Sequence, residues 1–315
     1  MVHPFRAVAP LTGLLSTSCV LAPAAVLPHD VLEGATCEPR LELESGASRS
    51  PPEGADVHAP HAMARGVSPD TLDVARAVAA LDEIERLAEA EDRGASHGEI
   101  ADLRGQLNDT IGAAALDVSS ILASIQCEEW RAREVASWLR DAEVKEVRKL
   151  TAASLVLSAS AAVATGVLAI VDKNDVPPAA VGIGGGILAG TIGYTTLSVH
   201  RTTRFLHARN LLGQVWRGGS HPDFPETVWA DLTRPELAEP RRTARDHVID
   251  MWKESGRLGD DPTHPAPERV ALFFGEGGTY DANGLFARAG MLGELGQIVN
   301  LMFHDLQHLA RGAGE

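Results

Sequence analysis

The sequence contains few aromatic residues and few cysteines. Aromatic side chains make up 4% of the 315 residues, whereas glycine and alanine are abundant, so small residues supply much of the apolar fraction. Small residues favour close packing of helices over a bulky core. The three cysteines, Cys19, Cys37 and Cys127, show neither a CxxC motif nor a regular spacing. We therefore expect neither a zinc site nor a disulfide framework.

Positive charge is also scarce. The chain has 28 Lys and Arg residues against 43 Asp and Glu residues, a formal net charge of −15. Nucleic-acid-binding proteins need a basic face that neutralises phosphates, so this balance argues against a nucleic-acid partner. No motif indicates a cofactor, and we expect none.

Residues 1–27 have the features of an export leader. One early cation, Arg6, precedes an uncharged, mostly apolar run that ends in "LSTSC". With the small Ser18 before Cys19, this stretch resembles the bacterial lipobox, whose cysteine is lipidated, although Ser16 stands where a lipobox usually has Leu. Ordinary cleavage near "APAAV", an uncleaved anchor over about residues 7–27 and a misassigned start are the alternatives.

Residues 28–68 are rich in Pro, Gly, Ser and acidic residues, which predicts a disordered tether. Residues 69–149 have apolar residues at helical spacing and predict a helical stalk. Its first helix is expected to begin after Ser68 as N-cap and to end at Gly94, and a long second helix begins with a capping box of Ser96 and Glu99. Its apolar series is Ile100, Leu103, Leu107, Ile111, Ala114, Val118, Ile121, Ile125, Ala132, Val135 and Leu139.

Two uncharged segments, Leu150–Val171 and Val176–Val199, flank the short polar turn "DKND". Each is long enough to cross a hydrocarbon core, so residues 150–199 predict a transmembrane helical hairpin. Small residues recur every four positions in both arms and would form a glycine-zipper contact; these residues are Ser158, Ala162, Gly166, Gly182, Gly186 and Gly190. A buried hairpin of a soluble protein is the alternative.

The charges that flank this hairpin conflict with the leader. Basic residues precede the first arm and follow the second; they are Arg140, Lys145, Arg148, Lys149, Arg201, Arg204 and Arg209. The positive-inside rule would leave both flanks in the cytoplasm, whereas an export leader would place them outside it.

Residues 200–315 predict a small, mostly helical C-terminal domain. The second arm is expected to continue as a helix to Gly218 and Gly219, and a final helix is expected from about Ala282. The fold class is therefore all-α, with a long amphipathic stalk, a membrane hairpin and this domain.

Two stretches of residues 200–315 resemble sites only weakly. "GEGGTYDANG" lacks the lysine of a P-loop, so it indicates a turn with Thr279 or Asp281 as a helix cap. His304 and His308 lie four apart on a helix and could share a zinc, but no third ligand is evident.

The sequence favours a non-enzymatic, membrane-anchored protein of the bacterial envelope that acts as a structural or interaction module. Its expected partners are membrane lipid and either a second copy or another envelope protein. A pore-forming helical protein is the alternative, and a metal-dependent hydrolase using His304 and His308 is the weaker one.

Overall fold

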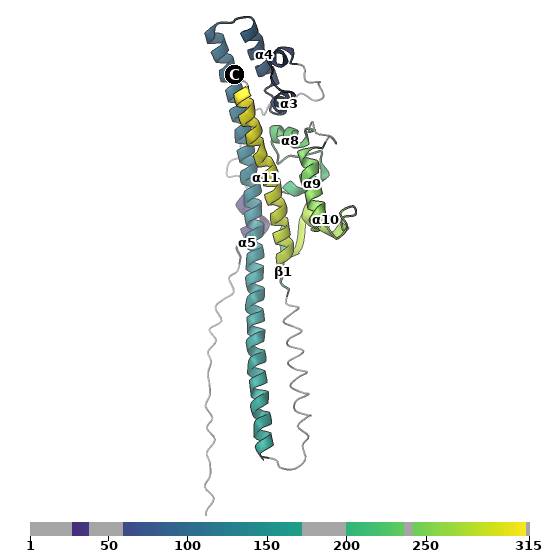
Figure 1. The fold of residues 1–315 in the computed structure, drawn as a ribbon. Coiled ribbons are helices and arrows are strands. Elements are labelled where there is room, and N and C mark those ends of the chain that lie inside the picture. Colours follow the sequence, from purple (N-terminus) through teal and green to yellow (C-terminus); the bar gives the residue numbers. More distant parts are fainter. Residues whose placement is uncertain (1–26, 38–58, 172–199, 236–241, 313–315) are drawn as a thin grey trace, which may run out of the picture.

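The computed structural model describes residues 27–37, 59–171, 200–235 and 242–312. This part of the chain is mostly helical, which confirms the expected helical character of the fold (Figure 1). The elements in chain order are α1 (His29–Glu33), η1 (Ala35–Cys37), α2 (Pro60–Ala64), α3 (Pro69–Ala77), α4 (Leu81–Asp92), α5 (His97–Val171), β1 (Thr202–Leu206), α7 (Leu211–Arg217), α8 (Glu226–Thr233), α9 (Ala244–Glu254), α10 (Pro267–Phe274), β2 (Gly277–Asp281) and α11 (Ala282–Gly312).

Helix α5 is the axis of the molecule. Its 75 residues form one continuous helix, so the predicted second stalk helix and the first hairpin arm are a single element. Helix α11 runs antiparallel to the first half of α5 (Figure 1). Helices α9 and α10 lie on the other side of α11, and α8 contacts both α5 and α11 (Figure 1). From Leu107 onward, the apolar series expected for this helix is buried against its neighbours. The series therefore marked the packed face of α5 correctly.

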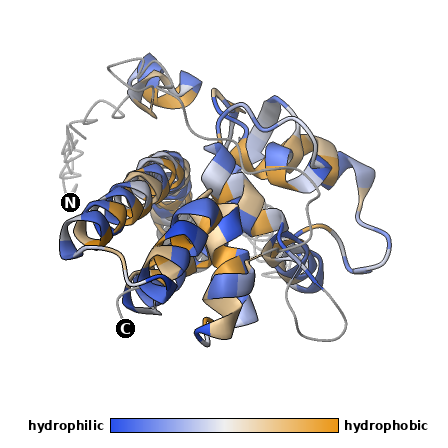
Figure 2. Ribbon diagram, turned by 90° about the horizontal axis from the view of Figure 1, so that it is seen from above, coloured by the Kyte–Doolittle hydropathy of each residue, from blue (hydrophilic) through white to orange (hydrophobic). Residues whose placement is uncertain are grey.

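The helices share one core. Buried apolar side chains from α3, α4, α5, α7, α8, α9 and α11 belong to a single cluster, so the predicted stalk and C-terminal domain pack together. Viewed along the long axis, these helices gather side by side, and each carries both hydrophilic and hydrophobic residues (Figure 2). We call the described residues outside 144–171 the body.

The first stalk helix is two helices in the structure. Ser68 accepts a hydrogen bond from the Thr71 backbone N–H at 3.1 Å, as expected of an N-cap, but α3 ends at Ala77. Ala79 adopts a positive φ of 58°, which breaks the helix before α4 begins. The single helix expected up to Gly94 is therefore wrong, because its apolar spacing continues across the break.

The capping box expected before α5 is only half formed. Ser96 accepts a hydrogen bond from the Glu99 backbone N–H at 3.3 Å. The Glu99 carboxylate pairs with Arg93 instead.

Parts of the predicted tether are ordered. Residues 29–37 form α1 and η1, and α2 covers Pro60–Ala64, with Val31, Ala59 and Ala62 buried. Cys37 and Cys127 form a disulfide that holds residues 29–37 on α5. The expectation of no disulfide framework is therefore wrong. The two cysteines are 90 residues apart, and no local spacing signals a pair at that separation.

Residues 202–206 form a strand, and the expected continuation of a helix from residue 200 to Gly218 is wrong. Strand β1 pairs antiparallel with β2, with Thr202 opposite Asp281 and Phe205 opposite Gly278. Thr202 and Thr203 are β-branched and favour a strand over a helix. Gly277 has a φ of +104°, and a Cβ there would lie 2.3 Å from the Phe205 carbonyl oxygen, so this register requires glycine.

Candidate membrane-proximal site

The environment of α5 changes at Glu143. Glu143 is the last residue of the helix with a described, buried side chain, and none of the side chains described after it, up to Val156, is buried. We call residues 144–171 of α5 the outer segment; it extends past the rest of the ribbon (Figure 1). Leu155 and Val156 on this segment are 65% and 69% exposed. From Leu150 to Val171 the segment carries no charge, and an uncharged helix with exposed apolar side chains is suited to lipid and poorly suited to water.

A search of the described residues by length and apolar composition finds one helix that could cross a membrane. It is α5, over His97–Ala153, a span that lies mostly in the body, and 22% of its most apolar window is buried.

Basic residues surround the helix where the outer segment begins. Lys145, Arg148 and Lys149 on α5 and Arg204 on β1 are exposed, and no ion pair joins them to an acid within the described residues. We call the residues Arg140–Lys149 and His200–Arg204 the junction. The chain as a whole is strongly acidic, so this concentration of cations is local.

The chain returns to the body close to the point at which it leaves. The backbone N–H of Arg201 donates a hydrogen bond to Oε1 of Glu143 at 2.9 Å, and the Arg201 guanidinium pairs with Glu146. Glu143 also lies 3.9 Å from Arg140. These contacts hold the start of β1 against the last buried turn of α5.

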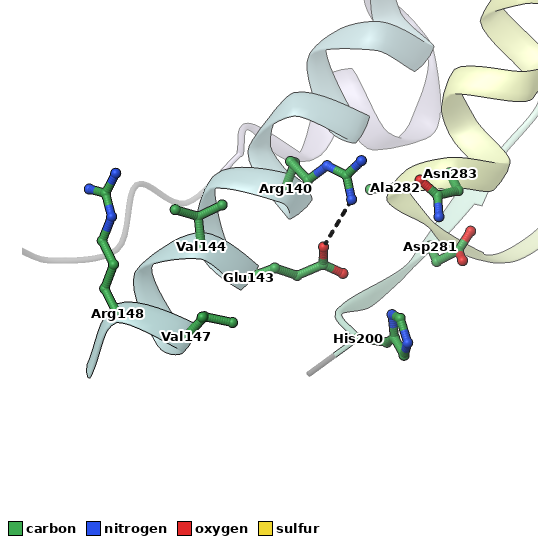
Figure 3. A pocket seen from close by; sticks show the side chains of 9 residues that line it. All are labelled: Arg140, Glu143, Val144, Val147, Arg148, His200, Asp281, Ala282 and Asn283. Carbon is green, nitrogen blue, oxygen red and sulfur yellow. Dashed lines mark ion pairs between the residues drawn. The ribbon is translucent and has the colours of Figure 1, made fainter. Parts of the chain in front are cut away.

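A cavity of about 290 Å³ opens at the junction (Figure 3). Arg140, Glu143 and Arg148 on α5 contribute charge to its wall, and Val144 and Val147 contribute apolar surface. Its other wall consists of His200 before β1 and residues 281–283 at the start of α11. The cavity therefore lies between the helix that leaves the body and the segments that follow its return.

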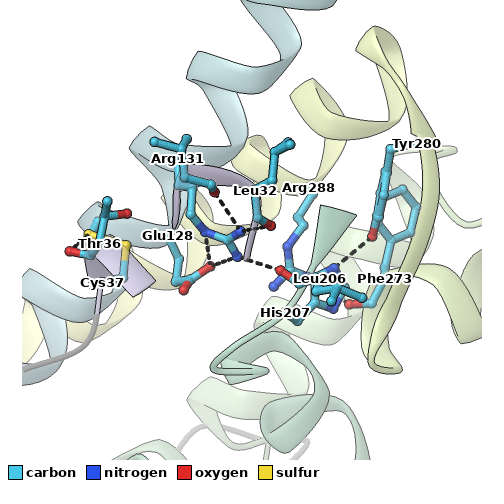
Figure 4. Close-up of polar contacts among 12 residues, drawn as sticks. Leu32, Thr36, Cys37, Glu128, Arg131, Leu206, His207, Phe273, Tyr280 and Arg288 are labelled. Carbon is cyan, nitrogen blue, oxygen red and sulfur yellow. Dashed lines mark hydrogen bonds and ion pairs between the residues drawn. A yellow bond between two sulfur atoms is a disulfide. The ribbon is translucent and has the colours of Figure 1, made fainter. Parts of the chain in front are cut away.

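A buried arginine holds the segments above the junction together (Figure 4). Arg131 and Glu128 are both fully buried, and two guanidinium nitrogens of Arg131 donate to Glu128 Oε2 at 2.6 and 3.2 Å. Arg131 also donates to three carbonyl oxygens: Val31 at 3.2 Å, Leu32 at 3.0 Å and Leu206 at 2.8 Å. This one side chain thus joins α5 to α1 and to the end of β1.

The packing around Arg131 is tight. Its guanidinium carbon lies 4.0 Å from the centre of the Phe205 ring. Gly34 ends α1 with a φ of +88°, and a Cβ at this position would come within 2.7 Å of Ala208 and 3.2 Å of the guanidinium. A larger residue than glycine would therefore separate α1 from Arg131.

A second buried polar group lies beside β1 and β2. His207 lies 2.8 Å through Nδ1 from the Gly275 carbonyl and 3.0 Å through Nε2 from the Tyr280 hydroxyl. Burial, and secondly the charge of Arg288, lower the pKa of His207 to about 2. The ring is therefore neutral, and its Nδ1–H donates to Gly275. The Tyr280 hydroxyl also lies 2.7 Å from the Leu272 carbonyl, so its single hydrogen faces two acceptors.

Arg288 lies fully buried next to this pair. It donates to the Phe273 carbonyl at 2.8 Å, while its Nε and Nη2 atoms have no hydrogen-bond partner among the described residues. Burial lowers the pKa of Arg288 to about 10 and raises the pKa of Tyr280 to about 12. These groups are enclosed by the body, so we interpret them as structural.

Most of the residues predicted to act in the membrane lie outside the described residues. These are Cys19, Gly182, Gly186 and Gly190. Ser158, Ala162 and Gly166 lie on the outer segment of α5, where steps of four residues place them on one side of the helix. Lipidation and the glycine-zipper contact therefore stay predictions.

The weak site candidates of the C-terminal part have local structural roles. Asp281 caps α11 by accepting a hydrogen bond from the Gly284 N–H at 2.7 Å, which confirms the expected cap. His304 and His308 are exposed on α11, and the intervening Asp305 pairs with Arg234. Within the described residues, no group of three or more His, Cys, Asp or Glu side chains could hold a metal ion.

Sequence reasoning missed the buried charges and the cavity. Glu128 and Arg131 lie at i, i+3 spacing next to the apolar series of α5. This spacing of opposite charges was the signal from which a buried ion pair could have been predicted. The cavity depends on the antiparallel return of the chain at β1, which no local pattern indicated.

No family model matches the chain, and neither a curated protein nor a solved structure matches it.

Proposed function

We propose that the chain is a non-enzymatic, membrane-anchored protein of the bacterial envelope that holds its helical body at the lipid surface as a structural or interaction module. The observation that carries this proposal is the course of α5. One helix runs without a break from a buried core into residues 150–171, which carry no charge and on which Leu155 and Val156 are exposed. Lipid is the environment in which such a segment is stable.

The disulfide supports export of the body. Disulfides form and persist in oxidising compartments and are rare in the cytosol. Cys37 and Cys127 both belong to the body, so their pairing favours the exported side over the cytoplasmic side that the basic flanks suggest. On this proposal the hairpin enters the membrane from the exported face.

The body supplies extended surface for a partner. Leu116 and Trp130 on the packed half of α5 are 72% and 51% exposed. They lie two heptads apart and therefore share one side of the helix. A second copy or another envelope protein is the proposed partner.

Membrane fractionation of matched variants tests the anchor. Leu155→Asp with Val156→Asp places two carboxylates in the outer segment, where a charge costs up to about 3 kcal/mol at the centre of a span and less toward its end. Leu116→Asp with Trp130→Asp makes the same change at exposed positions of the body. Both pairs are tested in a Cys19→Ala background, because a lipid on Cys19 would by itself retain the protein.

We expect the unsubstituted background and the Leu116/Trp130 variant to remain in the membrane pellet after alkaline carbonate, and the Leu155/Val156 variant to be released. Thiol alkylation before and after reduction checks that each variant has formed the Cys37–Cys127 disulfide. Release of all three proteins, or retention of all three, would overturn the proposal.

A further inference from the structure

We propose that the cavity at the junction binds the phosphate of an anionic phospholipid headgroup. This inference rests on the proposed function, because it assigns the cavity to the lipid surface from which the outer segment begins. The cavity combines charged and apolar walls, and it lies at the residue where burial of α5 ends.

The acidic groups of the cavity already have partners. Glu143 accepts the Arg201 backbone N–H and faces Arg140, and Asp281 accepts the Gly284 backbone N–H. Arg148 has no ion pair within the described residues. Arg140 shares its charge with Glu143 at 3.9 Å, so among the described residues Arg148 is the unpaired guanidinium of the cavity wall and Arg140 is the second cation beside it.

Phosphate suits these groups. A guanidinium presents several N–H donors in one plane and binds phosphate oxygens through two parallel hydrogen bonds. The opposite wall includes Ala282 and Asn283 at the start of α11, where the Asp281 carboxylate already accepts the Gly284 backbone N–H. Arg140 points toward the start of α11 across this space (Figure 3).

The apolar wall favours a lipid over a free phosphate. Val144, Val147 and Ala282 line the cavity together with the charged groups. A phosphodiester with a glycerol and acyl chains attached would place its phosphate on the guanidiniums and its first methylene groups on the valines. Inorganic phosphate would leave that apolar surface in water.

The test is a titration of the full chain in a neutral detergent. The probes are dihexanoyl-phosphatidylglycerol, dihexanoyl-phosphatidylcholine and inorganic phosphate, and binding is followed by native mass spectrometry. Because insertion into a bilayer is not needed for binding in detergent, this result is separate from the fractionation result. We expect binding of the anionic lipid at least roughly tenfold tighter than binding of either other probe.

Two pairs of substitutions remove equal charge from the same turns of α5. Arg140→Gln with Arg148→Gln removes the cations of the cavity, whereas Lys145→Gln with Lys149→Gln removes two exposed cations that do not line it. The arginine pair should weaken binding of the anionic lipid by about tenfold or more, and the lysine pair by less than about threefold. Equal losses would show diffuse surface attraction and overturn the proposal.

Val147→Trp fills the cavity without changing any charge. It should weaken binding of the phosphatidylglycerol as strongly as the arginine pair does. Circular dichroism and the state of the disulfide check the fold of each variant. Binding of inorganic phosphate as tight as that of the lipid, or unchanged lipid binding in Val147→Trp, would each overturn the assignment to a lipid.

Discussion

The two halves of α5 belong to one helix but are stabilised in different ways. Up to Glu143, aliphatic residues at steps of three and four are buried against α11, α8 and α4, and the buried Glu128–Arg131 ion pair links the helix to α1 and β1. From Val144 onward no described side chain is buried, and alanine, serine and threonine become frequent. A continuous backbone therefore does not imply one environment. The absence of charge over residues 150–171 separates the part suited to lipid from the part that packs on protein.

Arg131→Met should have the largest effect on the body half. It leaves the buried Glu128 carboxylate without its cation and breaks the links to α1 and β1, a loss of about 3–5 kcal/mol in the free energy of unfolding. Urea denaturation of the full chain in neutral detergent, followed by circular dichroism, measures it.

The control for this prediction is Arg133→Met, two residues away, where an exposed arginine pairs with Glu129. It should cost less than about 1 kcal/mol. Adding Glu128→Gln to Arg131→Met should recover part of the lost stability, since no unpaired carboxylate then remains buried. A double variant no more stable than the single one would contradict this account.

Leu139→Ala and Val144→Ala test where the boundary lies. Leu139 is 1% exposed and Val144 is 40% exposed, although they are five residues apart on one helix. The first substitution should destabilise the body by about 2–5 kcal/mol through the cavity it leaves, and the second by about 0.5 kcal/mol or less. The same denaturation series measures both, and similar losses would place the boundary farther along α5.

Cys37→Ser should destabilise only the body half. The disulfide closes a loop of 90 residues, and disulfides typically contribute about 2–4 kcal/mol. The thermal midpoint of the body should fall, while carbonate extraction of the outer segment should not change. Cys19→Ser is the matched substitution and should leave the midpoint unchanged. Detachment of the Cys37→Ser variant from the membrane would show that the two halves depend on each other.

The smallest effect is expected from pH and again concerns the body. The pKa of His207 is about 2 in the folded protein, whereas a histidine in the unfolded chain titrates near 6.5. As the pH falls below 6.5, the unfolded state takes up a proton that the folded state does not, so the free energy of unfolding decreases. The loss between pH 7.5 and 5.5 should be about 1 kcal/mol.

His207→Gln removes this titration. The difference between the stability of the unsubstituted protein and that of the variant should therefore shrink as the pH falls toward 5.5. A difference that stays constant over this range would mean that the His207 ring takes up a proton inside the body.

Local signals identified those parts of the fold that depend on neighbours in the sequence. The apolar series from Leu107 to Leu139 marked the packed face of α5, Ser68 marked the start of α3, and Asp281 marked the start of α11. Each of these signals involves spacings of three or four residues, which the geometry of a helix fixes.

Features that join distant residues could not be predicted in this way. The disulfide spans 90 residues, and the Arg131 side chain reaches carbonyls at Val31 and Leu206. Strand β1 forms because it pairs with β2, which is distant in the sequence. The helix break at Ala79 does not interrupt the helical spacing of the apolar residues, so the sequence pattern does not reveal it. The cavity combines residues from α5, the start of β1 and α11, so it exists only once these segments have come together.

The hydrogen bond from the Arg201 N–H to Glu143 has a consequence for how such a chain can be built. The chain leaves the body after Glu143 and returns at Arg201, and the hydrogen bond between these two residues holds both ends of the intervening segment, residues 144–200, together. A short loop could replace this segment and leave a water-soluble body suitable for crystallisation, and the same attachment point could accept the hairpin of another protein.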